Sequence, residues 1–296
     1  RDLIRERGGE VEMQTKVTRI TRDGMKVTGV DIEQPDGTVA HVPAEHVVNS
    51  MAIDDLIAAF DPPPPPEVLE AASRLRYRDF LIVTLVLKSA DPFPDNWIYV
   101  HAPEVKVGRI QNFRAWSADM IPNPETSSIG MEYFCQAGDG LWTMTDGDLR
   151  ALASRELAQL GLAKEDDVID AAIIRQPKAY PVYDGEYQGA LEVISAWLKQ
   201  VEGFQTVGRN GLHRYNNQDH SMLSAMYAAR NILGANYDVW NVNVERSYHE
   251  DFTTEEENAR ASAEAGESTI TRLGKTRTAP THSQAHRSDS ESREAG

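Results

Sequence analysis

The segment 204–234 constrains the fold more than any other part of the chain, because it combines a strand, a glycine turn, a polar loop and a helix. Residues 204–207 form the short apolar run that predicts the strand. Gly208 and Gly211 follow it and allow the backbone to bend closely. We therefore expect a mixed α/β (α+β) fold in which this strand leads through a tight turn into a helix.

The predicted helix has clear start and stop signals. Asn216 or Asn217 can cap its N-terminus, and Asp219 lies in its first turn. Gly234 supplies the C-terminal stop. Four apolar residues recur at helical spacing and predict one buried face, namely Met222, Met226, Ala229 and Leu233.

The start of this helix is a candidate binding site. A helix N-terminus carries unpaired N–H groups and a partial positive charge, which suit a phosphate or the pyrimidine end of a flavin. A carboxylate in the first turn could hold a ribityl hydroxyl. The alternative is an ordinary capped helix that packs on a sheet, and the pattern alone favours this alternative.

The order of residues in this segment resembles the C-terminal flavin-binding motif of the FAD-dependent amine oxidase and protoporphyrinogen oxidase-like superfamily. The branch that contains UDP-galactopyranose mutase is the most similar. The resemblance is carried by Gly208, Arg209, Arg214, Tyr215 and Asp219, followed by the run His220, Ser221, Met222. It implies FAD as the cofactor.

The same resemblance implies which residues bind the cofactor. Asp219 would reach the ribityl chain, and the backbone of residues 220–222 would approach the flavin ring. The implied set in this segment is Gly208, Arg209, Gly211, Asp219, His220, Ser221 and Met222.

Composition excludes several classes of protein. The 296 residues carry a net charge of −16, so no basic surface is available for nucleic acid. Cys135 is the only cysteine, which excludes an intrachain disulfide and a cysteine metal cluster and favours a reducing cytoplasm. We expect it to be inert core. The sequence has no apolar run long enough for a membrane helix, and no metal site is expected.

The beginning of the chain departs from the superfamily pattern. The first residue is Arg1, and residues 2–7 read as the charged last turns of a helix that Gly8 and Gly9 stop. The superfamily opens with a strand, a GxGxxG turn and a helix whose N-terminus takes the FAD pyrophosphate. Because this motif is missing, we expect an N-terminally incomplete chain with a discontinuous FAD-binding domain of Rossmann-like type.

Residues 11–50 predict a three-stranded meander followed by a buried strand. Alternation in 11–20 gives the first strand, and turns at Asp23-Gly24 and Asp36-Gly37 separate the next two. Val17 matches a position at which the superfamily touches the adenine through its backbone. The alternative is a half-buried strand valine with no ligand.

The predicted domains follow from the proline run 62–66, an extended spacer that leads into a helix at 67–75. We expect residues 1–61 and 188–252 to form the FAD-binding domain. Residues 62–187 would form an inserted mixed β-sheet domain that binds the substrate. Within it we expect a strand at 106–116, a helix at 146–160 and an aromatic and proline-rich loop at 176–187. Residues 253–296 read as a disordered tail with no chemistry, so His282 and His286 are not expected to bind a metal.

Candidate substrate residues lie in the middle of the chain. Arg109 follows Gly108 on a strand where the mutases carry an arginine that faces an anionic sugar nucleotide, and a guanidinium suits a diphosphate. Tyr180 and Tyr183 resemble a segment that lines the substrate side of the flavin. The alternatives are a strand arginine paired with a carboxylate and plain aromatic packing. His213 is expected to be a hydrogen-bonded structural histidine.

The function implied is that of an FAD-dependent oxidoreductase, amine oxidase or protoporphyrinogen oxidase-like, whose flavin accepts a hydride from a small-molecule substrate. A UDP-galactopyranose mutase-like isomerase acting on a nucleotide sugar is the second hypothesis. The third is an inactive remnant or an interaction module. No GxSxG, HExxH or P-loop motif is present, and the sequence identifies no catalytic residue.

Overall fold

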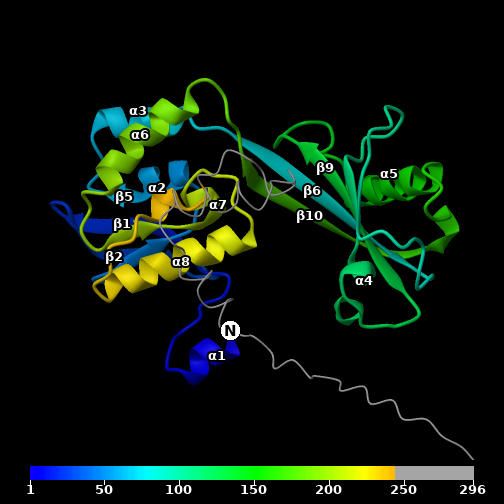
Figure 1. Cartoon of the computed structure of the whole chain (residues 1–296), viewed down its shortest axis with the longest axis horizontal. Coiled ribbons are helices and arrows are strands. Elements are labelled where there is room, and N and C mark those ends of the chain that lie inside the picture. The colour runs from blue at the N-terminus through cyan, green and yellow to red at the C-terminus, as the bar shows by residue number, and fades with distance from the viewer. Residues whose placement is uncertain (244–296) are drawn as a thin grey trace, which may run out of the picture. The chain divides into compact units, whose positions relative to one another are not determined.

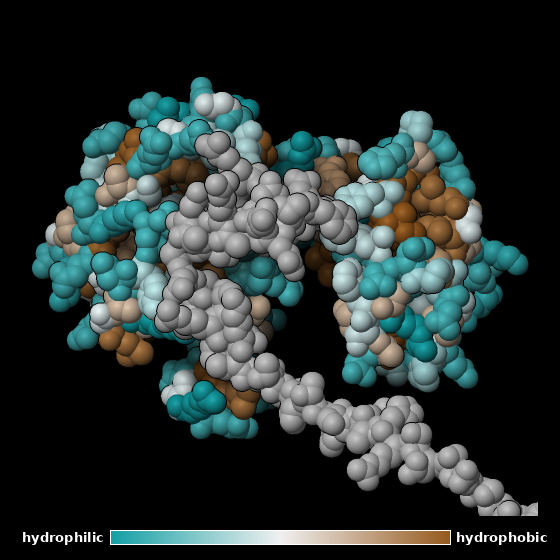
Figure 2. Space-filling model, viewed as in Figure 1, coloured by the Kyte–Doolittle hydropathy of each residue, from teal (hydrophilic) through white to brown (hydrophobic). Residues whose placement is uncertain are grey.

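The computed structural model describes residues 1–243. This part has a mixed α/β fold with three sheets (Figure 1). The predicted tail at 253–296, with His282 and His286, lies outside the described residues. No helix within residues 1–243 is long and apolar enough to cross a membrane. On the face shown in Figure 2, hydrophilic side chains cover most of the described surface, with hydrophobic residues visible in patches.

The first core is built around a four-stranded sheet of order β3-β2-β1-β5. The predicted meander forms its antiparallel part, and β5 pairs parallel to β1. Its elements are β1 (Lys16–Asp23), β2 (Lys26–Glu33), β3 (Val39–Pro43), α2 (Ile53–Ala59), β5 (Phe60–Asp61), α3 (Pro66–Ser73) and α6 (Tyr187–Leu198). Ile20, Leu56, Ala71 and Ile194 from four of them pack in one cluster. The helix α1 (Asp2–Glu6), which precedes Gly8, has no buried residue.

The second core is one sheet of order β10-β6-β9-β8-β7, antiparallel throughout, with α5 on one face. Its elements are β6 (Tyr77–Leu87), β7 (Trp97–Tyr99), β8 (Arg109–Asn112), α4 (Phe113–Trp116), β9 (Ser127–Cys135), α5 (Asp146–Gln159) and β10 (Val168–Pro181). Alternate residues of β6, such as Leu81 and Val83, pack under Leu149 of α5. Cys135 is buried here, and burial with the nearby Asp139 and Asp79 carboxylates raises the pKa of its thiol to about 11, as expected for an inert cysteine.

Two long strands connect the cores. In Figure 1, β6 and β10 run side by side, and Tyr77 at the start of β6 is opposite Pro181 at the end of β10. The helix α3, which begins at Pro66, the last residue of the proline run, packs in the first core. The predicted domain limits and the Rossmann-like character of the first core stay predictions.

Two predicted segments differ in the structure. The strand predicted at 106–116 ends at Asn112, because the Asn112 side chain accepts a hydrogen bond from the N–H of Ala115 and caps the helix α4. The loop predicted at 176–187 is instead the end of β10 as far as Pro181, with an irregularity between Gln176 and Tyr180 that the period-two pattern does not reveal.

The helix α8 (Gln218–Ile232) buries a different face from the predicted one. Met222, Met226, Ala229 and Leu233 are exposed, with Leu233 at 87%. The buried residues are Ser224 and Ala228. Small side chains allow the helix backbone to approach its neighbours: Ser224 Oγ accepts from the N–H of Gly208, and Gln205 Nε2 donates to the carbonyl of Ala228.

A buried hydrogen-bond network joins the carboxyl ends of β4 (Val47–Asn49) and β11 (Phe204–Thr206), which pair in parallel. Asn49 Nδ2 donates to Thr206 Oγ1 at 3.0 Å, and that hydroxyl donates to the carbonyl of Gly211 at 2.7 Å. The N–H of Val207 donates to the carbonyl of Asn49 at 2.8 Å. The glycine turn is therefore fixed against both strand ends.

Gly211→Ala tests this close approach. A Cβ at Gly211 would lie 2.6 Å from Thr206 Oγ1 and 3.3 Å from the carbonyl oxygen of Asn49, so we expect a loss of about 1–3 kcal/mol in the free energy of unfolding measured in urea. The control is Gly189→Ala in α6, where a Cβ meets nothing within 4 Å; it should be neutral or stabilising by up to about 1 kcal/mol. Equal effects of the two substitutions would contradict the network.

Candidate functional site

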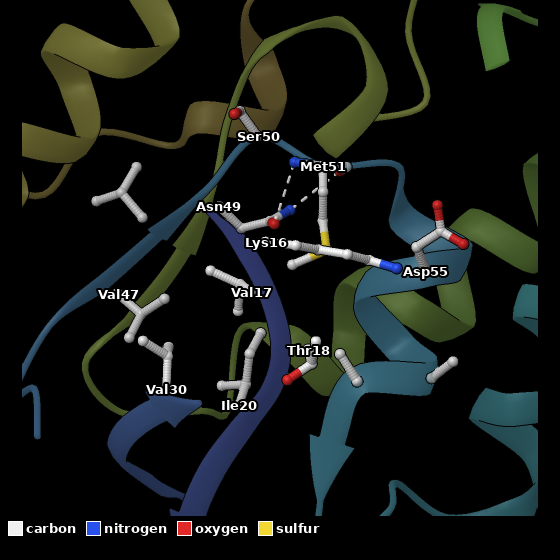
Figure 3. Close-up of a pocket in the computed structure, with 13 residues that line it drawn as sticks. Lys16, Val17, Thr18, Ile20, Val30, Val47, Asn49, Ser50, Met51 and Asp55 are labelled. Atoms are coloured by element: carbon white, nitrogen blue, oxygen red, sulfur yellow. Dashed lines mark hydrogen bonds between the residues drawn. The ribbon is translucent and has the colours of Figure 1, made fainter. Parts of the chain in front are cut away.

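A cavity of about 590 Å³ opens beside the end of β4. Figure 3 shows Val17, Ile20, Val30 and Val47 gathered on its apolar side, while Asn49 bonds the backbone of Met51 on another side. The remaining lining comes from Lys16, Thr18, Val48, Ser50, Asp55, Ala58 and Ala59. An apolar wall with a few polar groups at its rim is the usual lining for a flat heteroaromatic ring. The structure thus puts the predicted Val17 in a cavity of suitable size and chemistry.

The second pocket, of about 470 Å³, lies at the start of α8. Three of the predicted cofactor residues line it, namely Arg209, Ser221 and Met222. The other lining residues are Asn216, Asn217 and Gln218. The N-terminal turn of a helix and a guanidinium meet here, so the pocket suits an anionic or electron-rich ligand edge.

The glycines of the motif flank Arg209, which lines this pocket. Gly208 is buried with φ +81°, a conformation that favours glycine. Its N–H donates to Ser224 Oγ, and its carbonyl accepts from Asn216 Nδ2, each at 3.1 Å. Gly211 is buried against Thr206. Both glycines contribute through the backbone conformation of the short helix α7 (Gly208–Gly211), to which they belong.

His220 and Asp219 line neither pocket. The Asn217 side chain accepts from the backbone N–H of His220, and His220 Nδ1 accepts from the N–H of Asn217 at 3.3 Å, which closes the helix end. Asp219 lies 3.2 Å from the same nitrogen with its side chain 64% exposed. Nδ1 can accept from Asn217 only when it carries no proton, so the cap and a hydrogen bond from Nδ1 to Asp219 exclude each other.

Arg209 connects the glycine turn to the second core. Its Nε donates to the carbonyl of Asn216 at 2.8 Å. Its guanidinium lies 4.6 Å from the ring centre of Tyr215 and 5.0 Å from that of Tyr180. The two tyrosine rings stack at 5.6 Å with an angle of 18°. Cation–π contact of this kind orders the guanidinium at the pocket wall.

Arg109 is a buried, paired residue. Only 7% of it is exposed, and 1% of Glu132. Arg109 Nε donates to Glu132 Oε2 at 2.5 Å, and Nη2 donates to the Tyr180 hydroxyl at 2.7 Å. Burial disfavours the charge, but Glu132 and Tyr180 outweigh it and hold the pKa of Arg109 above its ordinary value. The guanidinium also faces four further aromatic rings, those of Phe80, Trp97, Tyr99 and Phe134.

Tyr183 completes the aromatic group. Its hydroxyl accepts from the N–H of Tyr215 at 2.5 Å, and its ring stacks on Tyr187 at 4.7 Å. Burial raises the pKa of its hydroxyl. The structure therefore brings Arg109, the segment 180–183 and Arg209 together through Tyr180 and Tyr215, although these three parts of the chain are far apart in the sequence.

Several residues of the site were missed in the sequence. Glu132 is the most informative, because a single carboxylate within the apolar run 129–135 needs a buried cation as its partner. That signal could have paired it with Arg109. Lys16, Asn49 and Asp55 had no such signal, since they border a cavity that only the tertiary fold creates.

Removing Glu132 tests whether the buried charge of Arg109 depends on its partner for stability. Glu132→Ala leaves the guanidinium of Arg109 unpaired, and we expect a loss of about 3–5 kcal/mol in the free energy of unfolding. Replacing both residues by Met should cost less than the single change. The control is Asp61→Ala, which breaks the exposed pair with Arg19 and should cost at most about 1 kcal/mol. The idea fails if the double variant is less stable than Glu132→Ala.

Comparisons with solved structures show the fold. Reduced UDP-galactopyranose mutase superposes with a TM-score of 0.64 at 18% identity, over 77% of this chain and 48% of that chain. A protoporphyrinogen oxidase-type protein of Exiguobacterium sp. 255-15 gives 0.51 at 14% identity, over 68% and 43%. An A394C mutant of putrescine oxidase gives 0.51 at 11% identity, over 75% and 49%.

The chain thus spans about half the length of the solved structures that it matches. No curated protein matches its sequence. The family model of flavin containing amine oxidoreductases matches residues 1–189, and the cofactor of that family is FAD. Since this match covers more than half of the sequence, the chain belongs to the flavin containing amine oxidoreductase family.

Proposed function

We propose that this chain is the part of an FAD-dependent oxidoreductase that holds both ends of the cofactor and carries the substrate face. The observation that supports this proposal is the parallel pairing of β4 and β11, whose carboxyl ends are joined by the hydrogen bond between Asn49 and Thr206. The cavity with Val17 borders one strand end, and the pocket with Arg209 follows the other. Ligands of open α/β sheets bind outside the carboxyl ends of parallel strands.

The cavity beside β4 suits the adenine end. Val17, Ile20, Val30 and Val47 offer an apolar wall for a purine ring, and Asn49 fixes the Met51 backbone at the rim. The backbone of Val17 would contact the adenine, in line with the family resemblance. Lys16 and Asp55 at the rim would meet the polar ribose.

The pocket at α8 suits the pyrimidine end of the flavin. When bound, the flavin supplies the hydride acceptor. Arg209 and the N–H groups of the first turn would face its pyrimidine oxygens and stabilise the negative charge that reduction creates. Ser221 and Met222 would contact the ring, and Asp219 would reach the ribityl chain. Gly208 and Gly211 keep the turn close to the strands.

The substrate would approach from the aromatic face of the second core. Tyr180 and Tyr183 would border it, and Arg109 would orient Tyr180 through the hydrogen bond to its hydroxyl. With Nε held by Glu132, Arg109 contributes to substrate binding mainly by fixing this face. A small molecule with an apolar or aromatic part fits such a surface.

A second candidate is an isomerase that acts on a nucleotide sugar. The similarity to UDP-galactopyranose mutase, with a TM-score of 0.64, supports it. Aromatic rings beside a guanidinium, as around Arg109, can also hold a nucleotide. Absorbance spectra of the protein purified from its natural source, recorded under anaerobic conditions, distinguish the oxidase from the isomerase. Bleaching of the visible flavin bands by a primary amine supports the oxidase. Conversion of a UDP-sugar by the chemically reduced protein supports the isomerase.

Arg209→Gln tests the assignment of the flavin end. Loss of one charge-assisted contact should weaken FAD binding about 10-fold or more, measured by equilibrium titration of FAD fluorescence. Arg230→Gln in the last turn of the same helix, where the guanidinium lies over Tyr237, is the matched control and should leave the affinity unchanged. Absence of flavin absorbance in the protein isolated from its source cell would reject the flavoenzyme proposal itself.

A further inference from the structure

One face of the five-stranded sheet in the second core gathers aromatic side chains. Side chains alternate between the two faces of a strand. In β7, β8 and β9, the residues Ile98, Ile110 and Tyr133 pack with α5 in the second core. Their neighbours in the same strands therefore point to the opposite face of the sheet, namely Trp97, Tyr99, Arg109, Glu132 and Phe134.

Aromatic rings on this face lead to the pocket at the start of α8. The guanidinium of Arg209, which lines that pocket, lies 5.0 Å from the ring centre of Tyr180. The ring centre of Tyr180 lies 5.9 Å from that of Phe134. The guanidinium of Arg109 lies 4.9 Å from the ring centre of Phe134 and 5.0 Å from that of Trp97. Contacts between neighbouring side chains thus run from the pocket to β7 at the end of the sheet.

The outer part of this face is open to solvent. Trp97 stacks on Tyr99 with ring centres 5.4 Å apart, and the ring centre of Trp116 in α4 lies 6.4 Å from that of Trp97. These three residues and Phe134 are each between 37% and 51% exposed. We call the four residues the aromatic platform. A contiguous group of exposed apolar side chains indicates a surface that binds another molecule.

The platform presents ring surfaces, and the charge beside it is not accessible. The guanidinium of Arg109 lies at most 6.0 Å from the ring centres of Trp97, Tyr99 and Phe134, yet Arg109 is buried. Glu132, which is also buried, accepts a hydrogen bond from Arg109 Nε. The charge of Arg109 is therefore balanced by a carboxylate and covered by rings.

The rings of the platform are held in place by their neighbours. The guanidinium of Arg109 attracts the electron-rich ring faces around it, and stacking aligns Trp97 with Tyr99 at an angle of 29°. A Cβ at Gly108 would lie 3.1 Å from the ring of Phe134, so the glycine lets this ring lie close to the strand. Ring faces that are fixed before a ligand binds lose little conformational freedom on binding.

We propose that the aromatic platform binds the end of the substrate that lies away from the flavin, and that this end is a flat, unsaturated and uncharged ring system. The inference rests on the proposed function, because contacts through Tyr180 connect the platform to the pocket assigned to the flavin. Flat unsaturated rings gain from offset stacking on fixed aromatic faces. A phosphate or carboxylate would need an accessible cation, and Arg109 is already paired with Glu132.

Two uncharged probes with the same carbon skeleton test the ring preference. 2-Naphthylmethanol is flat and unsaturated, whereas decahydro-2-naphthylmethanol is saturated and thicker. Burial of apolar surface alone makes the saturated probe bind at least as tightly, but stacking favours the flat probe. We expect the dissociation constant of the flat probe, measured by equilibrium dialysis against the whole protein, to be lower by about 5-fold or more. Equal affinities, or tighter binding of the saturated probe, overturn the proposal.

An anionic probe tests whether the platform offers a charge. 2-Naphthoate is flat and carries a carboxylate at neutral pH. Because Arg109 is buried against Glu132, we expect 2-naphthoate to bind no more tightly than 2-naphthylmethanol. Tighter binding of the anion would reveal an accessible cation and would refute an uncharged substrate end.

Substitutions locate the binding on the platform. Trp97→Leu and Tyr99→Leu keep an apolar side chain but remove the ring face, so each should weaken the binding of 2-naphthylmethanol about 5-fold or more and that of the saturated probe much less. Because β7 is an edge strand, both variants should unfold in urea near the wild-type midpoint. The matched control is Tyr237→Leu, which removes another exposed ring, stacked on Tyr227 outside the platform. Equal losses in all three variants contradict binding at the platform, and the comparison of probes on the unsubstituted protein decides if a variant fails to fold.

The visible absorbance of the same protein distinguishes failure of this inference from failure of the proposed function. Flavin bands without a preference for the flat probe reject the role of the platform and leave the oxidoreductase standing. A preference that depends on Trp97, in a protein without flavin bands, rejects the oxidoreductase and with it the assignment of the bound ring to a substrate.

Discussion

The hydrogen bonds of Asn49 and Thr206 are the contact on which the arrangement of the site depends. They join the carboxyl ends of two short parallel strands that are distant in the sequence. Both side chains are at least nine-tenths buried, so each lost bond would leave a polar atom without water. Because Thr206 also holds Gly211, the same contact fixes the glycine turn. The position of the turn and of the start of α8 is thus set by buried polar groups together with hydrophobic packing.

The second core reaches this turn through stacked aromatic and cationic groups. Glu132 holds Arg109, Arg109 holds the Tyr180 hydroxyl, and Tyr180 stacks on Tyr215 beside Arg209. A buried ion pair costs desolvation and is weak evidence for stability, but its fixed geometry can define one arrangement of its neighbours. Here it orders the face that we propose for the substrate. The family membership supports FAD as the cofactor, and this chain spans about half the length of the matched structures.

The elements were largely predictable because their signals are local. The meander follows from period-two alternation and two turn dipeptides, and α5 follows from the spacing of Leu149, Leu152 and Leu157. The ends of β8 and β10 were not predictable in the same way. Asn112 acts as a cap only because the chain bends there, and the irregular pairing near Lys178 depends on contacts with α2 and α7.

The sequence by itself determined the glycine turn, the capped helix and the resemblance to flavoproteins, because these rest on residues that are neighbours in the chain. Only the tertiary structure decided which face of α8 is buried, since Ser224 and Ala228 permit a close approach that Met222 and Met226 do not. It also decided that Arg109 pairs with Glu132 and that His213 is buried. Burial and desolvation arise from packing between distant segments, and no local pattern encodes them.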